Sequence, residues 1–261
     1  MKQRFKLQLV TAICFSLAIS PFFVLAATPS KDFTNRQQSF HKVMELSNAE
    51  IQNLNKSLDD LQLDGNSEYA QEKTKLSEIL SGFDAYNKEV SEKISKAKSV
   101  ASLKTLAVEY KNWRENTYNL QAQIIINFSL LVQQRAMLDT ANDRLNKVQK
   151  DVEKLGNLGV DQITQLNLLL DKSRQNLGDA NQSFEKAKTI IDDYFSATST
   201  PATTTEEIAT STANASSTID VEINEGQVDA SQLQLLLEDG FTKIKSAYEA
   251  FIEMSAVVKK L

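Results

Sequence analysis

Cysteine and histidine are almost absent from this sequence. Its 261 residues include one cysteine, Cys14, and one histidine, His41. Zinc sites and Ser–His or Cys–His nucleophile pairs need more of these side chains. The sequence also contains no Gly-rich phosphate-binding motif and no HExxH motif. We therefore expect a protein that is not an enzyme and carries no cofactor.

Proline and glycine are scarce as well. The three prolines (Pro21, Pro29 and Pro201) and seven glycines fall well below the usual share for a mixed fold. All three prolines lie outside the periodic regions described below. Because so few residues interrupt a helix, the composition predicts an all-α protein.

The N-terminal segment resembles an export signal. Lys2, Arg4 and Lys6 precede the mostly apolar run LQLVTAICFSLAISPFFVLA, which ends at Ala26. Small or modest residues at Val24 and Ala26 predict cleavage between Ala26 and Ala27. The alternative is a retained membrane anchor, but polar residues and Pro21 interrupt the run, and a spanning helix needs about 20 predominantly apolar residues. We expect a secreted or cell-envelope protein with no stable membrane span after cleavage.

The charge of the mature chain limits its partners. The sequence has 29 Lys and Arg against 34 Asp and Glu, and cleavage at Ala27 would leave a net charge of −8. This acidity argues against nucleic acid and against adhesion to anionic lipid. Cys14 would leave with the signal, so packing without disulfides must stabilise the mature fold.

Apolar residues recur with helical spacing along most of the chain. One row holds Ile163, Leu170, Leu177, Phe184 and Ile191, each seven residues apart, and a second holds Leu166, Ser173, Ala180, Ala187 and Tyr194. This heptad pattern is typical of a helix packed along a nearly parallel neighbour. Similar patterns over 33–61, 76–97, 103–155 and 233–261 predict five amphipathic helices.

Turns and caps divide these helices. DGNS at 64–67 and GNLG at 156–159 have the residues of tight turns. Ser99 and Ser102 can cap a third helix that starts near Leu103. That helix would run for about 54 residues, or about 80 Å at 1.5 Å per residue. Its apolar stripe thins at Asn116–Asn119, where we expect a kink.

One phrase occurs twice: VDQITQLNLLLD at 160–171 and VDASQLQLLLED at 228–239. The segment from Leu76 to Val100 also aligns with that from Leu166 to Ile190. These similarities predict two helical hairpins and a third copy of the hairpin's second helix. The expected fold is an elongated array of antiparallel helical hairpins with a tethered C-terminal helix.

Four segments follow from these patterns. They are a signal peptide (1–26), a bundle of two hairpin repeats (27–195), a Ser/Thr-rich linker (196–219) and a C-terminal amphipathic helix (220–261). The linker has no apolar periodicity, and its composition is typical of a flexible tether or a glycosylated stalk. We expect the C-terminal helix to dock on the first part of the long third helix, over Leu106, Tyr110, Trp113 and Leu120.

One segment resembles a calcium loop. In DVEINEGQVDASQL at 220–233 the candidate ligands are Asp220, Glu222, Asn224 and Asp229, but Gln232 stands where a bidentate carboxylate should close the shell. The other interpretation is that Asp229 caps the last helix and Gln232 completes a capping box. We expect no metal site here, and calcium is the weaker hypothesis.

The stretches LAVEYKNWRENTY and RLNKVQKDVEKLGNLGVD, with the signal and the Ser/Thr-rich spacer, carry a loose family resemblance over about residues 90–200. They resemble uncharacterised secreted helical-hairpin, coiled-coil-like proteins of small-genome candidate bacterial lineages. The resemblance implies bacterial export and a helical fold, and no activity.

The sequence therefore favours a non-enzymatic exported scaffold or interaction protein, at the cell envelope or outside the cell. The alternative is a protein that binds a small molecule or an ion such as calcium. We expect a protein partner, whose identity the sequence does not give, and a homo-oligomer is a further option.

Overall fold

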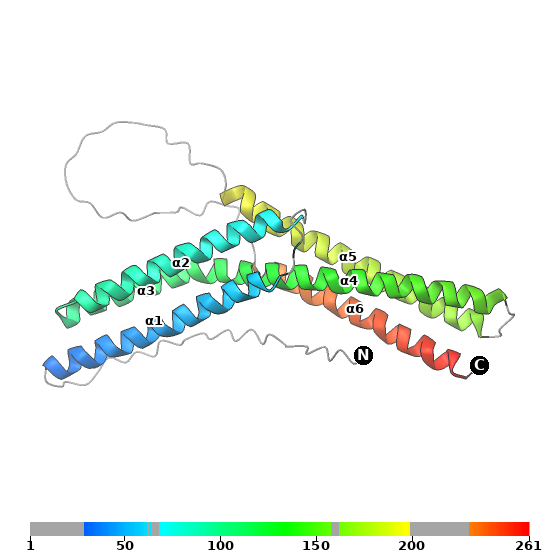
Figure 1. Cartoon of the computed structure of the whole chain (residues 1–261), viewed down its shortest axis with the longest axis horizontal. Coiled ribbons are helices and arrows are strands. Elements are labelled where there is room, and N and C mark those ends of the chain that lie inside the picture. The colour runs from blue at the N-terminus through cyan, green and yellow to red at the C-terminus, as the bar shows by residue number, and fades with distance from the viewer. Residues whose placement is uncertain (1–28, 62, 64–67, 158–161, 199–229, 261) are drawn as a thin grey trace, which may run out of the picture.

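The computed structural model describes residues 29–61, 63, 68–157, 162–198 and 230–260 (Figure 1). Nearly all of these residues are helical, and no strand occurs among them, so the all-α prediction is confirmed. The elements are α1 (Pro29–Asp59), α2 (Ala70–Lys96), α3 (Val100–Trp113), the π-helical segment η1 (Arg114–Tyr118), α4 (Asn119–Asn157), α5 (Ile163–Thr198) and α6 (Ala230–Val258).

The segments α3, η1 and α4 form one continuous helix from Val100 to Asn157. The predicted cap begins it: the Ser102 backbone N–H donates to Ser99 Oγ at 3.1 Å, and the Ser99 N–H donates to Ser102 Oγ at 3.3 Å. Where a kink was expected, near Asn116, the structure has the π-helical turn of η1. A π-helical turn inserts extra backbone and so changes the direction of the side chains that follow it.

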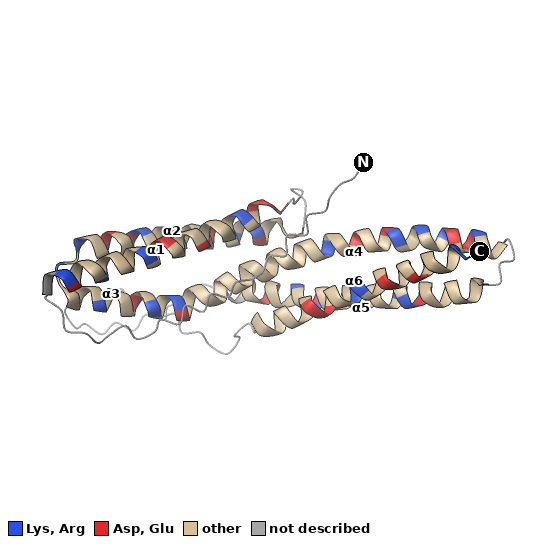
Figure 2. Cartoon of the chain, turned by 90° about the horizontal axis from the view of Figure 1, so that it is seen from below, with Lys and Arg blue, Asp and Glu red and all other residues tan. Residues whose placement is uncertain are grey.

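Two three-helix bundles share this long helix (Figures 1 and 2). In the first bundle, α1 and α2 pack against α3, and in the second, α5 and α6 pack against α4. The first pair is an antiparallel hairpin, and α6 runs antiparallel to α5. Because the bundles follow one another along a single helix, the described part of the molecule is elongated.

The apolar core runs through both bundles. One buried cluster extends from Ile51 in α1 to Val257 in α6, and a smaller cluster around Phe40 and Tyr110 fills the far end of the first bundle. The most extensive contact joins α5 and α6, where small buried residues let the two backbones approach. These residues are Ser173, Ala180, Ala187, Gly240, Ala247 and Ala250.

The repeated phrase forms the same helical face twice. Leu166 and Leu233 are both fully buried, and their neighbours Leu168 and Leu235 are 67% and 65% exposed. Leu170 and Leu237 follow one turn later and are again buried. The phrase therefore specifies which side of α5 and of α6 meets a neighbouring helix.

The expected docking place of the last helix was wrong. The helix docks within its own chain, but it lies against α4 and α5 in the second bundle. Leu106, Tyr110 and Trp113 pack instead with Phe40 and the other side chains of α1 and α2. The α1–α2 hairpin covers this surface, because α1 packs against both α3 and α4 and α2 packs against α3.

One segment boundary and the role of the last helix also differ from what was expected. Helix α5 continues to Thr198, three residues into the segment interpreted as a linker. Helix α6 completes the second bundle as its third helix, so the described chain consists of two three-helix units rather than two hairpins and a separate helix.

Replacing a helical glycine by alanine usually stabilises a protein, but at Gly240 we expect the opposite effect. A Cβ built at Gly240 lies 2.2 Å from Phe184 Cε1, on a ring that is fully buried, whereas one at Gly178 has no atom within 4 Å. Gly178→Ala should therefore stabilise the protein by about 1 kcal/mol. Gly240→Ala should destabilise it by about 1–3 kcal/mol, because overpacking outweighs the same gain. Urea unfolding of both variants measures the difference, and equal stabilisation would contradict the close α5–α6 contact.

Candidate functional site

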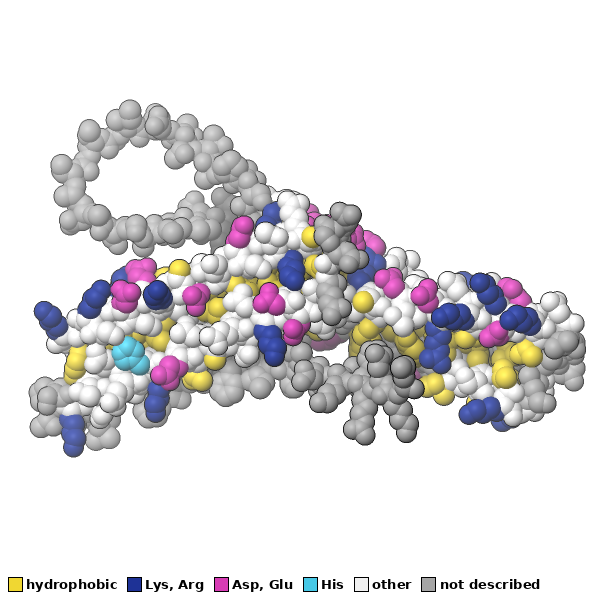
Figure 3. All heavy atoms as spheres, viewed as in Figure 1, with side chains coloured by type: hydrophobic (Ala, Val, Ile, Leu, Met, Phe, Trp, Pro, Cys, Tyr) yellow, Lys and Arg dark blue, Asp and Glu magenta, His cyan; other side chains and the backbone are white. Residues whose placement is uncertain are grey.

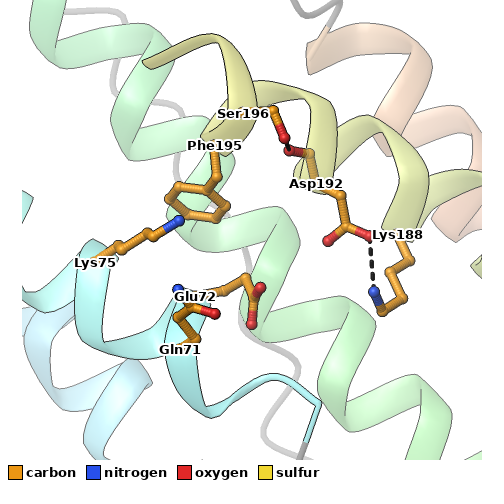
Figure 4. Close-up of a pocket in the computed structure, with 7 residues that line it drawn as sticks. All are labelled: Gln71, Glu72, Lys75, Lys188, Asp192, Phe195 and Ser196. Carbon is orange, nitrogen blue, oxygen red and sulfur yellow. Dashed lines mark hydrogen bonds and ion pairs between the residues drawn. The ribbon is translucent and has the colours of Figure 1, made fainter. Parts of the chain in front are cut away.

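A surface hollow of about 510 Å³ lies where the two bundles meet (Figure 4). The first turns of α2 form one wall, and the last turns of α5 form the other. The lining residues are Gln71, Glu72, Lys75, Lys188, Asp192, Phe195 and Ser196. Segments more than a hundred residues apart in the sequence therefore build this hollow together.

Charges of both signs face the hollow. Lys188 Nζ lies 2.7 Å from Asp192 Oδ2, and this hydrogen bond raises the pKa of the Lys188 ammonium, with Glu68 and Glu72 adding to the effect. Lys75 Nζ lies 5.0 Å above the ring of Phe195, a cation–π geometry. Glu72 Oε2 is buried and has no hydrogen-bond partner among the described residues. Two ammonium groups and two carboxylates suit a small polar ligand, but they do not form a nucleophile with its base.

Arg135 links α4 to α5 in the second bundle. From α4, its Nη1 donates to Asn181 Oδ1 at 2.6 Å, and its Nη2 donates to the Glu185 carboxylate of α5. Its guanidinium also lies 5.9 Å from the ring of Phe184. A charge-assisted pair of hydrogen bonds has a fixed geometry, so Arg135 sets how α5 lies along α4.

A buried polar layer crosses the first bundle. The Asn87 amide of α2 donates to Ser47 Oγ and to Asn48 Oδ1 of α1, both at 2.9 Å. Its carbonyl oxygen accepts from the Tyr110 hydroxyl of α3 at 3.2 Å. Asn87 is fully buried, and its partners come from both neighbouring helices. A buried asparagine in a helical bundle favours one register over others, and we assign Asn87 that role.

Arg114 extends the layer toward the surface. Its Nη1 donates to Ser47 Oγ at 3.2 Å, and its Nη2 donates to Glu50 Oε2 at 2.9 Å. The guanidinium lies 4.4 Å from the ring of Tyr118. Arg114 is the first residue of η1, so the π-helical turn positions it toward α1.

The aromatic residues of the long helix form core rather than a ligand site. Tyr118 is fully buried and Tyr110 is 3% exposed. The Trp113 ring lies 5.5 Å from Phe83 and 4.3 Å from Tyr86 of α2. These contacts place Tyr110, Trp113 and Tyr118 in the packing of the first bundle.

Several candidate residues lie outside the described part of the chain. These are the cleavage pair Ala26 and Ala27 and the calcium candidates Asp220, Glu222, Asn224 and Asp229. Among the residues that the structure describes, no three His, Cys, Asp or Glu side chains come together in a way that could hold a metal ion. The same residues include no helix that is long and apolar enough to cross a membrane.

Comparisons with known proteins give no relative. No family model, no curated protein and no solved structure matches this chain. The resemblance to secreted helical-hairpin proteins of candidate bacterial lineages therefore stays a prediction.

Sequence reasoning missed both the hollow and the buried polar layer. The hollow has no signal in the sequence, because it depends on how the two bundles meet. Asn87 of the buried polar layer did have a signal in the sequence. The alignment of Leu76–Val100 with Leu166–Ile190 places Asn87 opposite Leu177. Leu177 is 2% exposed in α5, so a polar residue at the matching position of α2 predicts a buried hydrogen bond.

Buried tyrosines predict a loss of stability at high pH. Burial raises the pKa of Tyr69 to about 12 and also raises the pKa of Tyr118 and Tyr194. An unfolded tyrosine ionises near pH 10, so the stabilisation is complete below pH 10 and is lost as pH rises through the folded pKa. For Tyr69 the free energy of unfolding should fall by about 3 kcal/mol between pH 10 and 12. Urea midpoints across this range should fall less steeply in Tyr69→Phe than in the parent protein, and parallel curves would contradict this account.

Proposed function

We propose that this protein is an exported, non-enzymatic scaffold that binds a protein partner at the cell envelope or outside the cell. The continuous helix from Val100 to Asn157 supports the proposal most directly. Its 58 residues extend about 85 Å at 1.5 Å per residue. A helix of this length, packed against two further helices along each half, separates two ends of the molecule and offers long charged faces between them.

The junction supports a stiff rather than a hinged rod. Tyr69, next to α2, lies 6.0 Å from Phe128 of α4, ring to ring. The Asn127 amide of α4 donates to the Ala230 carbonyl at the start of α6, at 3.4 Å. One buried cluster includes residues from both bundles. Packed cores resist bending because side chains interdigitate without voids.

A distance measurement tests the rod. Spin labels at the exposed positions Glu89 in α2 and Asn146 in α4 should be about 55 Å apart, given the helical rise, with one narrow distribution. Labels at Asn146 and Glu253, both in the second bundle, serve as the control for label mobility. A broad or two-peaked distribution for the first pair alone would show a hinge at the junction and overturn the rigid scaffold.

Export is the second part of the proposal. If the signal is cleaved as its residues indicate, N-terminal sequencing of the exported protein should begin at Ala27 or within a residue or two of it. Recovery of intact Met1 in a membrane fraction would contradict cleavage and support the retained anchor.

The alternative function is binding of a small polar molecule or an ion. The hollow between α2 and α5 favours this candidate, because Glu72, Lys75 and Lys188 converge there. Calorimetry separates the two functions for calcium, since a scaffold should unfold at the same temperature with calcium and with a chelator. A calcium-dependent rise in that temperature would favour the ion-binding protein.

A further inference from the structure

One end of the rod is formed by the start of α1 and the turn between α2 and α3 (Figure 1), and Figure 3 shows the side chains from the same side. Phe33 of α1 packs there in the same cluster as Ala97 and Leu103. The Gln37 amide of α1 also donates to the Ile94 carbonyl of α2 at 2.9 Å. The three helices are therefore held together up to this end, and their charged side chains share one surface, which we call the α2–α3 tip.

Basic residues exceed acidic ones at the α2–α3 tip. Residues 29–36, 89–98 and 100–107 contain six Lys or Arg and three Asp or Glu. Each acid pairs with a base one turn away: Asp32 with Arg36, Glu89 with Lys93 and Glu92 with Lys96. The net charge of these three ranges is thus +3, and Glu109, further along α3, adds one acidic charge near Lys93. The opposite end (150–157, 163–170 and 253–260) has four basic and three acidic residues.

This local charge differs from that of the whole chain. The described residues are balanced, with 26 Lys or Arg and 26 Asp or Glu, so the excess of acid lies elsewhere in the sequence. A surface charge acts over about one Debye length, about 8 Å at physiological salt. The acidity of the whole sequence therefore does not decide what the tip can approach.

We propose that the α2–α3 tip binds an anionic lipid bilayer, so that the rod stands with this end at the membrane. Charge complementarity favours an anionic surface, and connectivity favours lipid. The apolar run of residues 7–26 precedes Pro29 at the start of α1, so the chain leaves the bilayer at this end during export. The proposal rests on the proposed export, and it adds the orientation of the rod and the surface that it contacts.

Sedimentation with lipid vesicles tests the proposal. The protein used begins at Ala27, which retains every described helix, and the vesicles contain either phosphatidylcholine alone or a mixture with 30% phosphatidylglycerol. Three net basic residues predict about a hundredfold stronger partition onto the anionic vesicles at low salt. Raising the salt to 0.5 M should remove most of this preference.

Matched variants locate the contact. Lys31, Lys96 and Lys98 are exposed at the α2–α3 tip, and Lys154, Lys259 and Lys260 are exposed at the other end. Changing the first three to Glu should abolish the preference for anionic vesicles, whereas changing the second three should leave most of it. Circular dichroism must show unchanged helix content in both.

Two results would overturn the proposal: equal partition of the parent protein onto both kinds of vesicle, or equal losses in both triple variants. Binding is measured on purified protein, so it does not depend on the export experiment. A failure of lipid binding leaves the exported rod standing, and a failure of export leaves the vesicle result standing.

Discussion

Deleting residues 230–261 is expected to unfold the second bundle and leave the first bundle folded. Helix α6 is one of the three helices of that bundle. Its large buried side chains include Leu233, Leu237, Ile244, Phe251 and Met254. Burial of each such side chain contributes about 1.5–3 kcal/mol. Together they approach the whole stability of a typical domain, about 5–15 kcal/mol.

Helix content and dye binding measure this result. The truncated protein should lose more helix than the 29 residues of α6, because α5 and the second half of α4 lose their partner. It should also bind a hydrophobic dye or self-associate through the uncovered faces of α4 and α5. A matched control is Leu235→Ser, which changes a side chain of α6 that is 65% exposed and should have little effect.

The truncation also decides between two accounts of α6. A truncated chain that stays monomeric and as stable as the parent would mean that α6 does not support the second bundle. In that case α6 would be available to a foreign helix or to another copy of the chain, and capture of a partner would become the leading account of this segment.

Much of the fold could be predicted from the sequence because the signal is local. The two heptad rows of α5 are buried almost without exception: Leu166, Ser173, Ala180, Ala187, Phe184 and Ile191 are at most 1% exposed. The cap at Ser99 was also predicted, and the kink expected at 116–119 overlaps the π-helical turn that the structure has there, since each depends on residues close in the sequence. Periodicity and caps report which side of a helix is apolar and where it ends.

The sequence did not show which apolar stripes meet. The apolar stripes of all the helices are chemically similar, so α6 could have buried its own stripe against several of them. Its true place depends on complementary shapes, such as Gly240 against the Phe184 ring, and on the polar contact of Ser183 Oγ with Asp239 Oδ2 at 2.7 Å. These features pair residues more than fifty positions apart, and no single-segment pattern encodes them.

Replacing Leu170 by alanine should lower the stability by about 2–5 kcal/mol, the range for removing a buried leucine side chain. Leu170 is 5% exposed and lies on the apolar row of α5 that the repeated phrase encodes. Lys172 lies two residues further on and is exposed, so Lys172→Ala should change the stability by no more than about 0.5 kcal/mol. Urea unfolding with a common slope for the three proteins measures both values.

The repeat supplies a second copy of the same test. Leu237 takes the position of Leu170 in the second occurrence of the phrase and is 2% exposed. Leu237→Ala should therefore cost a similar 2–5 kcal/mol, although it lies on a different helix. If Leu170→Ala and Leu237→Ala both cost no more than Lys172→Ala, the repeated phrase does not define the buried face of these helices, and the packing of the second bundle would have to be reassigned.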